Sequence, residues 1–203
     1  MSVRQTDSRQ RVVEAAAGML ARHGLNATSI REMARRAEAP LGSTYHHFPA
    51  GKTQVIVEAV DFAGAYTAQQ LRRHLQAGLF EGVAGFIAMW RETLLRSNLH
   101  IGCPVLAVAV EEPLDEVAEE AQAAAARAFE EWQRILCEAF AREGLTGEQA
   151  VGLATLIVAS VEGAIAMARA YRRIEPFDRT AARLEPIIRQ ALVDCTKPAS
   201  AAE

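Results

Sequence analysis

A short polar segment near the N-terminus carries a dense group of chemically versatile side chains. Residues 43–47 read Ser-Thr-Tyr-His-His, so two hydroxyls, one phenol and two imidazoles follow one another. Such groups can hydrogen-bond phosphate oxygens and the edges of bases. Lys52 follows at the expected start of a helix, where its positive charge opposes the helix dipole. This placement is favourable if Lys52 and the free N–H groups beside it both face a phosphate, so we predict a contact with DNA.

The helices around this segment have helix-turn-helix proportions. Ser29, with Glu32 three residues later, predicts a capped helix start. Pro40 cannot continue that helix, so a turn and a very short second helix follow it. A long helix is then expected from near Lys52. The helices of the head itself are expected from near Asp7 to Gly24, from Ser29 to about Ala37 and from Gly42 to Phe48.

Charge divides the 203 residues into a basic head and an acidic body. Residues 1–52 hold eight Lys and Arg against four Asp and Glu, whereas residues 53–203 hold fourteen against twenty-one. A basic head favours a polyanion as its partner. Half of the residues are hydrophobic and only 6% are aromatic. This composition favours helices over sheets and excludes a disordered, collagen-like or disulfide-stapled chain.

The sequence shows no catalytic or cofactor-binding motif. It has no phosphate-binding glycine loop, no nucleophile elbow and no carboxylate pair with a partner acid or base. Cys103, Cys137 and Cys195 lie too far apart for zinc-ligand spacing, and no third ligand stands near His100 and Cys103. We therefore expect no catalytic residue, no metal and no cofactor. The odd number of thiols and the lack of an apolar signal-peptide core predict a cytoplasmic protein.

The body beyond residue 52 reads as helices throughout, which makes the chain all-α with about nine helices. Residues 150–161 carry no charge on any face. A helix that is apolar all round is covered on two sides, and we expect its own bundle and a second subunit, not a membrane, to cover it. Pro186 should kink the last helix or mark a later start. The candidate interface residues, for which an ordinary core position is the alternative, are Leu156, Ile157, Val161, Leu184 and Ile188.

Aromatic side chains from several body helices could surround one cavity. An apolar cavity with a few polar groups would bind a flat or bulky hydrophobic compound. Ordinary core packing is the alternative for each residue. Cys103 is interpreted as a buried thiol, and a redox role for it stays open. The candidate pocket residues are Phe62, Tyr66, Phe86, Trp90, Cys103, Phe129 and Trp132.

The head residues, taken together, resemble the DNA-binding head of the tetracycline-repressor (TetR) family of regulators. The similarity lies in TSIREMA at 28–34, in GSTYHHF at 42–48 and in Lys52. Two further segments resemble the LmrA/YxaF-like branch of that family, namely FPAGK at 48–52 and GCPV at 102–105. Glu38 stands where the family usually has glycine. Either the turn is left-handed, at a cost of about 1 kcal/mol, or Pro40 gives it a different shape. Thr44 stands where leucine is usual, so it is either exposed for contact or poorly packed.

The resemblance implies a homodimeric transcriptional regulator, usually a repressor, that binds a near-palindromic operator in double-stranded DNA. It implies a DNA-binding domain over 1–51 and an effector-binding and dimerisation domain over 52–203. A hydrophobic small molecule would favour a body shape whose heads no longer match the half-site spacing. The matching positions place Ser29, Tyr45 and Lys52 on phosphates, Ser43, Thr44 and His46 near base edges, and His47 beside the DNA backbone.

Two other kinds of function stay open from the sequence. A helical enzyme or acyl-ligand carrier would use the aromatic cavity and would need catalytic groups inside it. A helical adaptor would use the basic head to bind an acidic protein. The sequence identifies neither the effector nor the operator, nor whether the chain represses or activates transcription.

Overall fold

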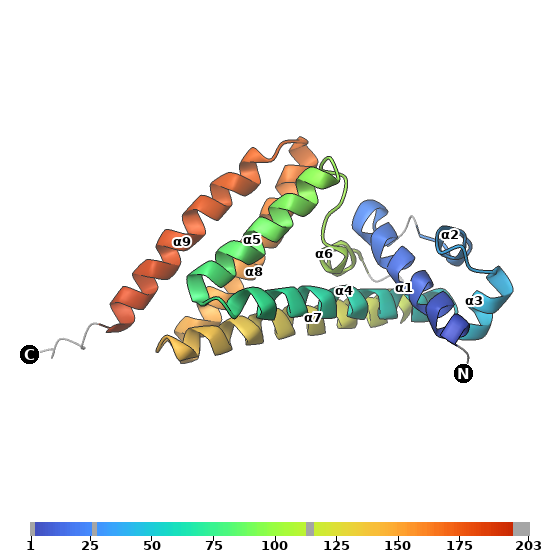
Figure 1. Cartoon of the computed structure of the whole chain (residues 1–203), viewed down its shortest axis with the longest axis horizontal. Helices are drawn as coiled ribbons and strands as arrows, with labels where there is room; N and C mark the ends of the chain where they lie inside the picture. The colour runs from blue at the N-terminus through green and yellow to red at the C-terminus, as the bar shows by residue number, and fades with distance from the viewer. Residues whose placement is uncertain (1–2, 26–27, 113–115, 197–203) are drawn as a thin grey trace, which may run out of the picture. The chain divides into compact units, whose positions relative to one another are not determined.

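The structure is a computed structural model that describes residues 3–25, 28–112 and 116–196. Within these ranges every regular element is a helix, which confirms the predicted all-α fold with about nine helices. The helices are α1 (Val3–His23), α2 (Ile30–Arg36), α3 (Leu41–His47), α4 (Lys52–Leu75), α5 (Leu79–Arg96), α6 (Pro104–Ala109), α7 (Glu116–Arg142), α8 (Gly147–Tyr171) and α9 (Glu175–Thr196) (Figure 1).

The chain divides into two compact units. The first holds Met1–Thr67 and Ile101–Phe129, and the second holds Ala68–His100 and Glu130–Glu203. Because α4 and α7 cross these limits, each of these long helices contributes residues to both units. The domain boundary expected after residue 51 lies inside the first unit, at the start of α4, and stays a prediction.

The first unit is built around α1, which packs against α2, α3 and α6. The buried stripe of α1 is the one that its apolar spacing predicts, with Val12 and Leu20 fully buried. Its end is also as predicted, because Gly24 adopts a φ of 74° and its N–H donates to the carbonyl of Leu20 (3.0 Å). The expected start near Asp7 is wrong, since the helix already begins at Val3.

The turn between α2 and α3 fixes where the short helix points. Ser29 caps α2 as predicted, and its Oγ accepts a hydrogen bond from the N–H of Glu32 (3.2 Å). At the other end, the N–H of Ala39 donates to the carbonyl of Ala34 (2.9 Å), which is the long bond of a Schellman motif. That motif needs a left-handed residue, and Glu38 occupies this position with a φ of 50°. Of the two turn shapes that the sequence leaves open, the left-handed one is therefore present.

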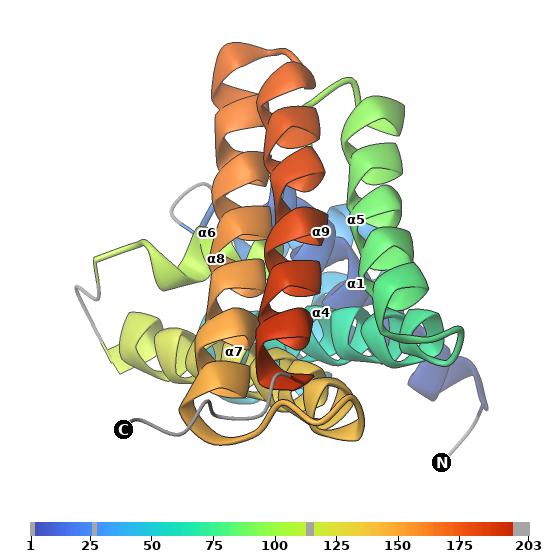
Figure 2. The ribbon, with the colours of Figure 1, turned by 90° about the vertical axis from the view of Figure 1, so that its left-hand side faces the viewer.

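In the second unit, α8 and α9 lie side by side, and α9 also contacts α5 (Figure 2). The last helix starts at Glu175, so Pro186 does not mark a later start of this helix. It continues through Pro186, which lacks the N–H that would bond one turn back. Length and apolar composition would allow α8 to cross a membrane, and 39% of its most apolar stretch is buried within the chain. The described residues thus leave much of the apolar surface of α8 uncovered.

Candidate nucleic-acid interface

The short helix α3 presents part of its polar segment to the outside. Tyr45 is 51% exposed, and His46 is exposed beside it. Ser43, near the helix start, is half-buried. Within four residues, α3 therefore carries an exposed phenol, an exposed imidazole and a half-buried hydroxyl. These are the groups that the sequence singled out as able to bond phosphates and base edges.

Thr44 does not share this surface, which corrects the expectation that it lies near base edges. It is 1% exposed, and its hydroxyl donates to the carbonyl of Pro40 (3.1 Å). Phe48, one turn later on the same face, is fully buried. Thr44 thus packs where the family usually has leucine, because α3 must bury one face against the rest of the head.

His47 is intermediate in exposure between Tyr45 and Thr44. The residue is half-buried, and its ring centroid is 5.9 Å from that of His46. Its Nε2 atom is buried and makes no hydrogen bond to any described residue. A contact between His47 and the DNA backbone stays a prediction.

Contacts around Phe48 hold the end of α3 against α1 and the start of α4. The guanidinium of Arg9 lies 5.2 Å from the centre of the Phe48 ring and forms an ion pair with Glu58 (2.6 Å). Gln54 accepts a hydrogen bond from the N–H of Ala50 (3.3 Å) and donates to Glu58 (3.0 Å). These contacts fix the turn that delivers the chain to the first residue of α4.

That first residue is Lys52, as the sequence predicts. The residue before it, Gly51, adopts a φ of 69°, a conformation that disfavours residues with a Cβ. Lys52 is half-buried at this helix end. Lys52 therefore belongs to the first turn of α4, whose earliest N–H groups have no partner within the helix, and such a helix start can bind an anion.

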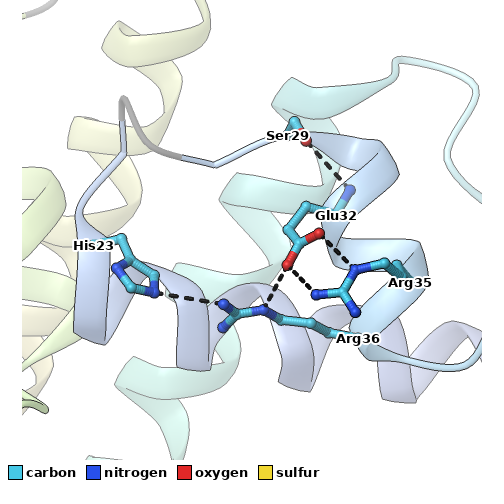
Figure 3. A network of polar contacts seen from close by, with 5 residues as sticks. All are labelled: His23, Ser29, Glu32, Arg35 and Arg36. Atoms are coloured by element: carbon cyan, nitrogen blue, oxygen red, sulfur yellow. Dashed lines mark hydrogen bonds and ion pairs between the residues drawn. The ribbon is translucent and has the colours of Figure 1, made fainter.

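A charged network covers the exposed side of α2 (Figure 3). Glu32 accepts two hydrogen bonds from Arg35 (2.6 and 2.8 Å) and one from Arg36 (3.0 Å). Arg36 Nη2 also lies 3.5 Å from His23 Nε2 at the end of α1. The hydrogen bonds from Arg35, and then those from Arg36, lower the pKa of Glu32 to about 2. Glu32 is therefore ionised at neutral pH and offsets part of the positive charge of α2.

Ser29 combines two roles at the start of α2. Its Oγ accepts the capping hydrogen bond from Glu32, which leaves the hydroxyl hydrogen available to donate. The residue is exposed. A phosphate placed at this helix end could therefore receive hydrogen bonds from the Ser29 hydroxyl and from the backbone.

The candidate pocket residues fall into both compact units. Phe86, Trp90 and Trp132 are buried in the second unit, and the indole N–H of Trp90 has no hydrogen-bond acceptor among the described residues. The other four belong to the first unit, where Cys103 is buried, Phe62 and Phe129 are half-buried and Tyr66 is exposed. A single cavity lined by all seven residues stays a prediction.

Cys103 and Cys137 have described environments, and neither belongs to a metal-binding cluster of the described residues. Cys103 Sγ accepts a hydrogen bond from the N–H of Leu106 (3.5 Å) and so caps the start of α6. Burial, and then the charge of Glu138, raise the pKa of the Cys137 thiol. The side chain of Cys195 lies outside the described residues. Within the described ranges, no three His, Cys, Asp or Glu side chains gather closely enough to hold a metal ion.

Four of the five candidate interface residues are covered by their own chain. Ile157, Val161, Leu184 and Ile188 are buried, whereas Leu156 is 39% exposed. Their role between subunits stays a prediction. The structure adds large apolar residues on α8 and α9 that the sequence reasoning missed, all of them more exposed than Leu156: Val151, Met167, Tyr171, Ile187 and Val193. Apolar periodicity could not find them, because it marks both the covered and the uncovered faces of such a helix.

Two family models match the chain. Residues 12–59 match the model described as bacterial regulatory proteins of the tetR family, and residues 80–183 match the C-terminal domain of LmrA/YxaF-like transcriptional regulators. An HTH-type transcriptional regulator of Mycobacterium tuberculosis H37Rv is 36% identical over 173 residues, which cover 84% of this chain and 88% of that protein. The HTH-type transcriptional regulator LmrA of Bacillus subtilis is 28% identical, over 84% of this chain and 90% of its own.

Solved structures show the same fold. Regulatory protein TetR from Rhodobacter sphaeroides superposes with a TM-score of 0.79 at 22% identity, over 88% of this chain and 97% of that one. A cysteine mutant of the TetR family regulator CifR, in complex with 26-bp double-strand operator DNA, superposes with a TM-score of 0.65 at 21% identity. That match covers 94% of this chain and 96% of the CifR chain.

Proposed function

The chain belongs to the TetR family of bacterial transcriptional regulators, within its LmrA/YxaF-like group, and we propose that it represses transcription as a homodimer that a hydrophobic effector releases from DNA. The observation that carries this proposal is the exposure of Tyr45 and His46 on α3, together with the position of Lys52 as the first residue of α4. The neighbour CifR, solved with operator DNA, supports this direction.

Different side chains of this surface would contact different parts of the DNA. Tyr45, Lys52 and Ser29 would hold phosphates and so fix the position of the head. Ser43 and His46 would then lie at base edges in the major groove, where donors and acceptors distinguish the base pairs. Two heads related by a two-fold axis would read half-sites about one helical turn apart, which requires a near-palindromic operator.

The uncovered face of α8 supports a second copy as its partner. Gly152, Leu156, Gly163 and Met167 follow one another at intervals of four, seven and four residues, so they share one face of the helix. All four are exposed. A Cβ atom at either glycine would meet no atom within 4 Å, so a facing helix could approach this stripe closely. Apolar and small residues on one continuous face are typical of helix–helix contacts between subunits.

The effector would act by favouring one of two body shapes. A compound that binds better to the shape whose heads do not fit the operator shifts the population away from DNA. The buried aromatic residues of the second unit support a hydrophobic compound. We place the protein in the cytoplasm, where bacterial DNA is found.

A gel shift with DNA from upstream of the chain's own gene tests this proposal. The dimer should retard that DNA, and its affinity should fall steeply as salt rises, because bound phosphates release counterions. Tyr45→Ala combined with Lys52→Ala should abolish the shift while circular dichroism shows an unchanged fold. Arg96→Ala is the matched control, since this exposed cation lies on α5 and should leave the shift as it is. Unchanged DNA affinity in the double variant would contradict the assigned surface.

A further inference from the structure

A second apolar site lies in the second unit, between α5 and α9. These helices are in contact (Figure 2). A cavity of about 200 Å³ opens between them. Val83 of α5 and Ile188 of α9 line it and are almost fully buried. None of the seven candidate pocket residues predicted from the sequence lines this cavity.

Small residues create the space. Ala84 and Ala88 lie one turn apart on α5 and are exposed, and Ala181 stands on α9. Larger side chains at these three positions would fill the gap between the two helices. Between Arg91 and Glu185 the lining is therefore mostly carbon, and the two buried branched side chains form part of its wall.

Charged contacts mark the two ends of the cavity. At one end, Arg91 of α5 forms two hydrogen bonds with the carboxylate of Asp178 on α9 (2.7 and 3.1 Å). At the other end, the guanidinium of Arg189 lies 4.1 Å from the centre of the Phe80 ring and forms an ion pair with Glu185 (2.7 Å). Arg91 and Glu185, the charged residues of the lining, are thus already paired.

From this arrangement we propose that the cavity between α5 and α9 binds a small, uncharged aromatic compound of one or two rings. Its carbon walls would desolvate a charged group, and the paired side chains offer no free counter-charge. Drug-sized ligands occupy roughly 300–1,000 Å³, whereas an apolar cavity of roughly 150 Å³ accommodates benzene. A cavity of about 200 Å³ therefore selects a compound between these limits. The Phe80 ring at one end favours an aromatic compound, because rings pack well in offset or edge-to-face contact.

This site would deepen the proposed function, and its regulatory part rests on that function. Ile188 of α9 lines the cavity, and α9 packs against α8, which carries the exposed stripe of the proposed subunit contact. A compound that separates α9 from α5 would therefore shift the subunit contact as well. The heads of the dimer would then be displaced from the operator spacing.

Calorimetry with the full-length dimer tests the binding. We use 2-naphthol, which is uncharged at pH 7, and 2-naphthoate, which has the same rings and a negative charge. One 2-naphthol per chain should bind, and 2-naphthoate should bind at least tenfold more weakly. Ala84→Phe and Ala88→Phe should each weaken 2-naphthol at least tenfold, because the new ring fills the cavity from an exposed position. Ala126→Phe, at an exposed alanine of α7 outside the cavity, is the matched control and should bind as the wild type does.

Three outcomes would overturn the proposal. The first is that 2-naphthol does not bind the wild type. The second is that the Phe variants bind 2-naphthol as tightly as the wild type does. The third is that the wild type binds 2-naphthol and 2-naphthoate with equal affinity. A change of molecular mass in the Phe variants would also overturn it, since it would show that a second chain covers the cavity. A gel shift without compound examines the DNA-binding function separately, and the Phe variants should retain it. With compound, the wild type should lose operator affinity and Ala84→Phe should not; an unresponsive wild type would refute the regulatory part.

Discussion

Replacing Glu38 with glycine should stabilise this protein. Glu38 holds a φ of 50° at the end of α2, where a residue with a Cβ costs about 1–2 kcal/mol. Glycine removes this cost but loses about 0.5–1 kcal/mol through its greater freedom in the unfolded chain. The hydrogen bond from the N–H of residue 38 to the carbonyl of Arg35 (3.2 Å) does not depend on the side chain. The expected net gain is therefore about 0.5–1 kcal/mol in the free energy of unfolding.

Urea unfolding at fixed protein concentration measures this gain, since the stability of a dimer depends on concentration. The melting temperature should rise as well, by about 2–4 °C per kcal/mol in a protein of this size. Glu130→Gly is the matched control, because Glu130 is exposed in the middle of α7 and glycine there should destabilise the chain by roughly 0.5–1 kcal/mol. If Glu38→Gly proved as destabilising as Glu130→Gly, the left-handed turn and the orientation of α3 that depends on it would be refuted.

Three further predictions concern the subunit contact, the charged network and the buried face of α3. Leu156→Asp should convert the dimer to a monomer in light scattering, because it places a charge on the exposed stripe of α8, whereas Leu95→Asp on α5 should leave the mass unchanged. Glu32 should titrate near pH 2 by NMR. Because the pKa of Glu32 is lowered on folding, its stabilising contribution is present above about pH 4.5 and is lost as the pH falls towards 2. A pKa near 4.5 would disprove its contacts with the two arginines. Thr44→Val should keep DNA affinity within about twofold, since the Thr44 side chain is buried and its hydroxyl donates to the carbonyl of Pro40. A tenfold loss of affinity in a gel shift would return Thr44 to the interface.

Local signals along the chain predicted most helix ends of the head. A capping serine at 29, a glycine at 24 and a lysine at 52 each mark a boundary that the structure also has. These signals act within one turn of the chain, so the sequence carries them directly. The start of α1 was predicted four residues too late, because Asp7 and Gln10 have the spacing of a capping box. In the structure, Gln10 instead donates to Glu14 (3.1 Å) within the helix.

Features that depend on how helices meet were harder to predict. The polar character of Thr44 suggested an exposed side chain, but the packing of α3 buries it. For α8, the sequence shows an apolar surface all round and does not reveal which side α9 covers; the structure covers Ile157 and leaves Leu156 exposed. The cavity beside Ala84 arises from small residues on two helices distant in sequence. Each of these depends on helix crossing, which apolar periodicity alone does not determine.

Selection of binding sites from random double-stranded DNA tests the central claim most directly, namely that α3 of two subunits enters the major groove. The wild-type dimer should select an inverted repeat whose half-sites lie about one helical turn apart. His46→Ala should select the same repeat with relaxed preference at one symmetric pair of positions, because a single exposed imidazole is removed from each head. The account would be contradicted if the wild type selected no symmetric sequence. It would also be contradicted if His46→Ala left the selected preferences unchanged at every position.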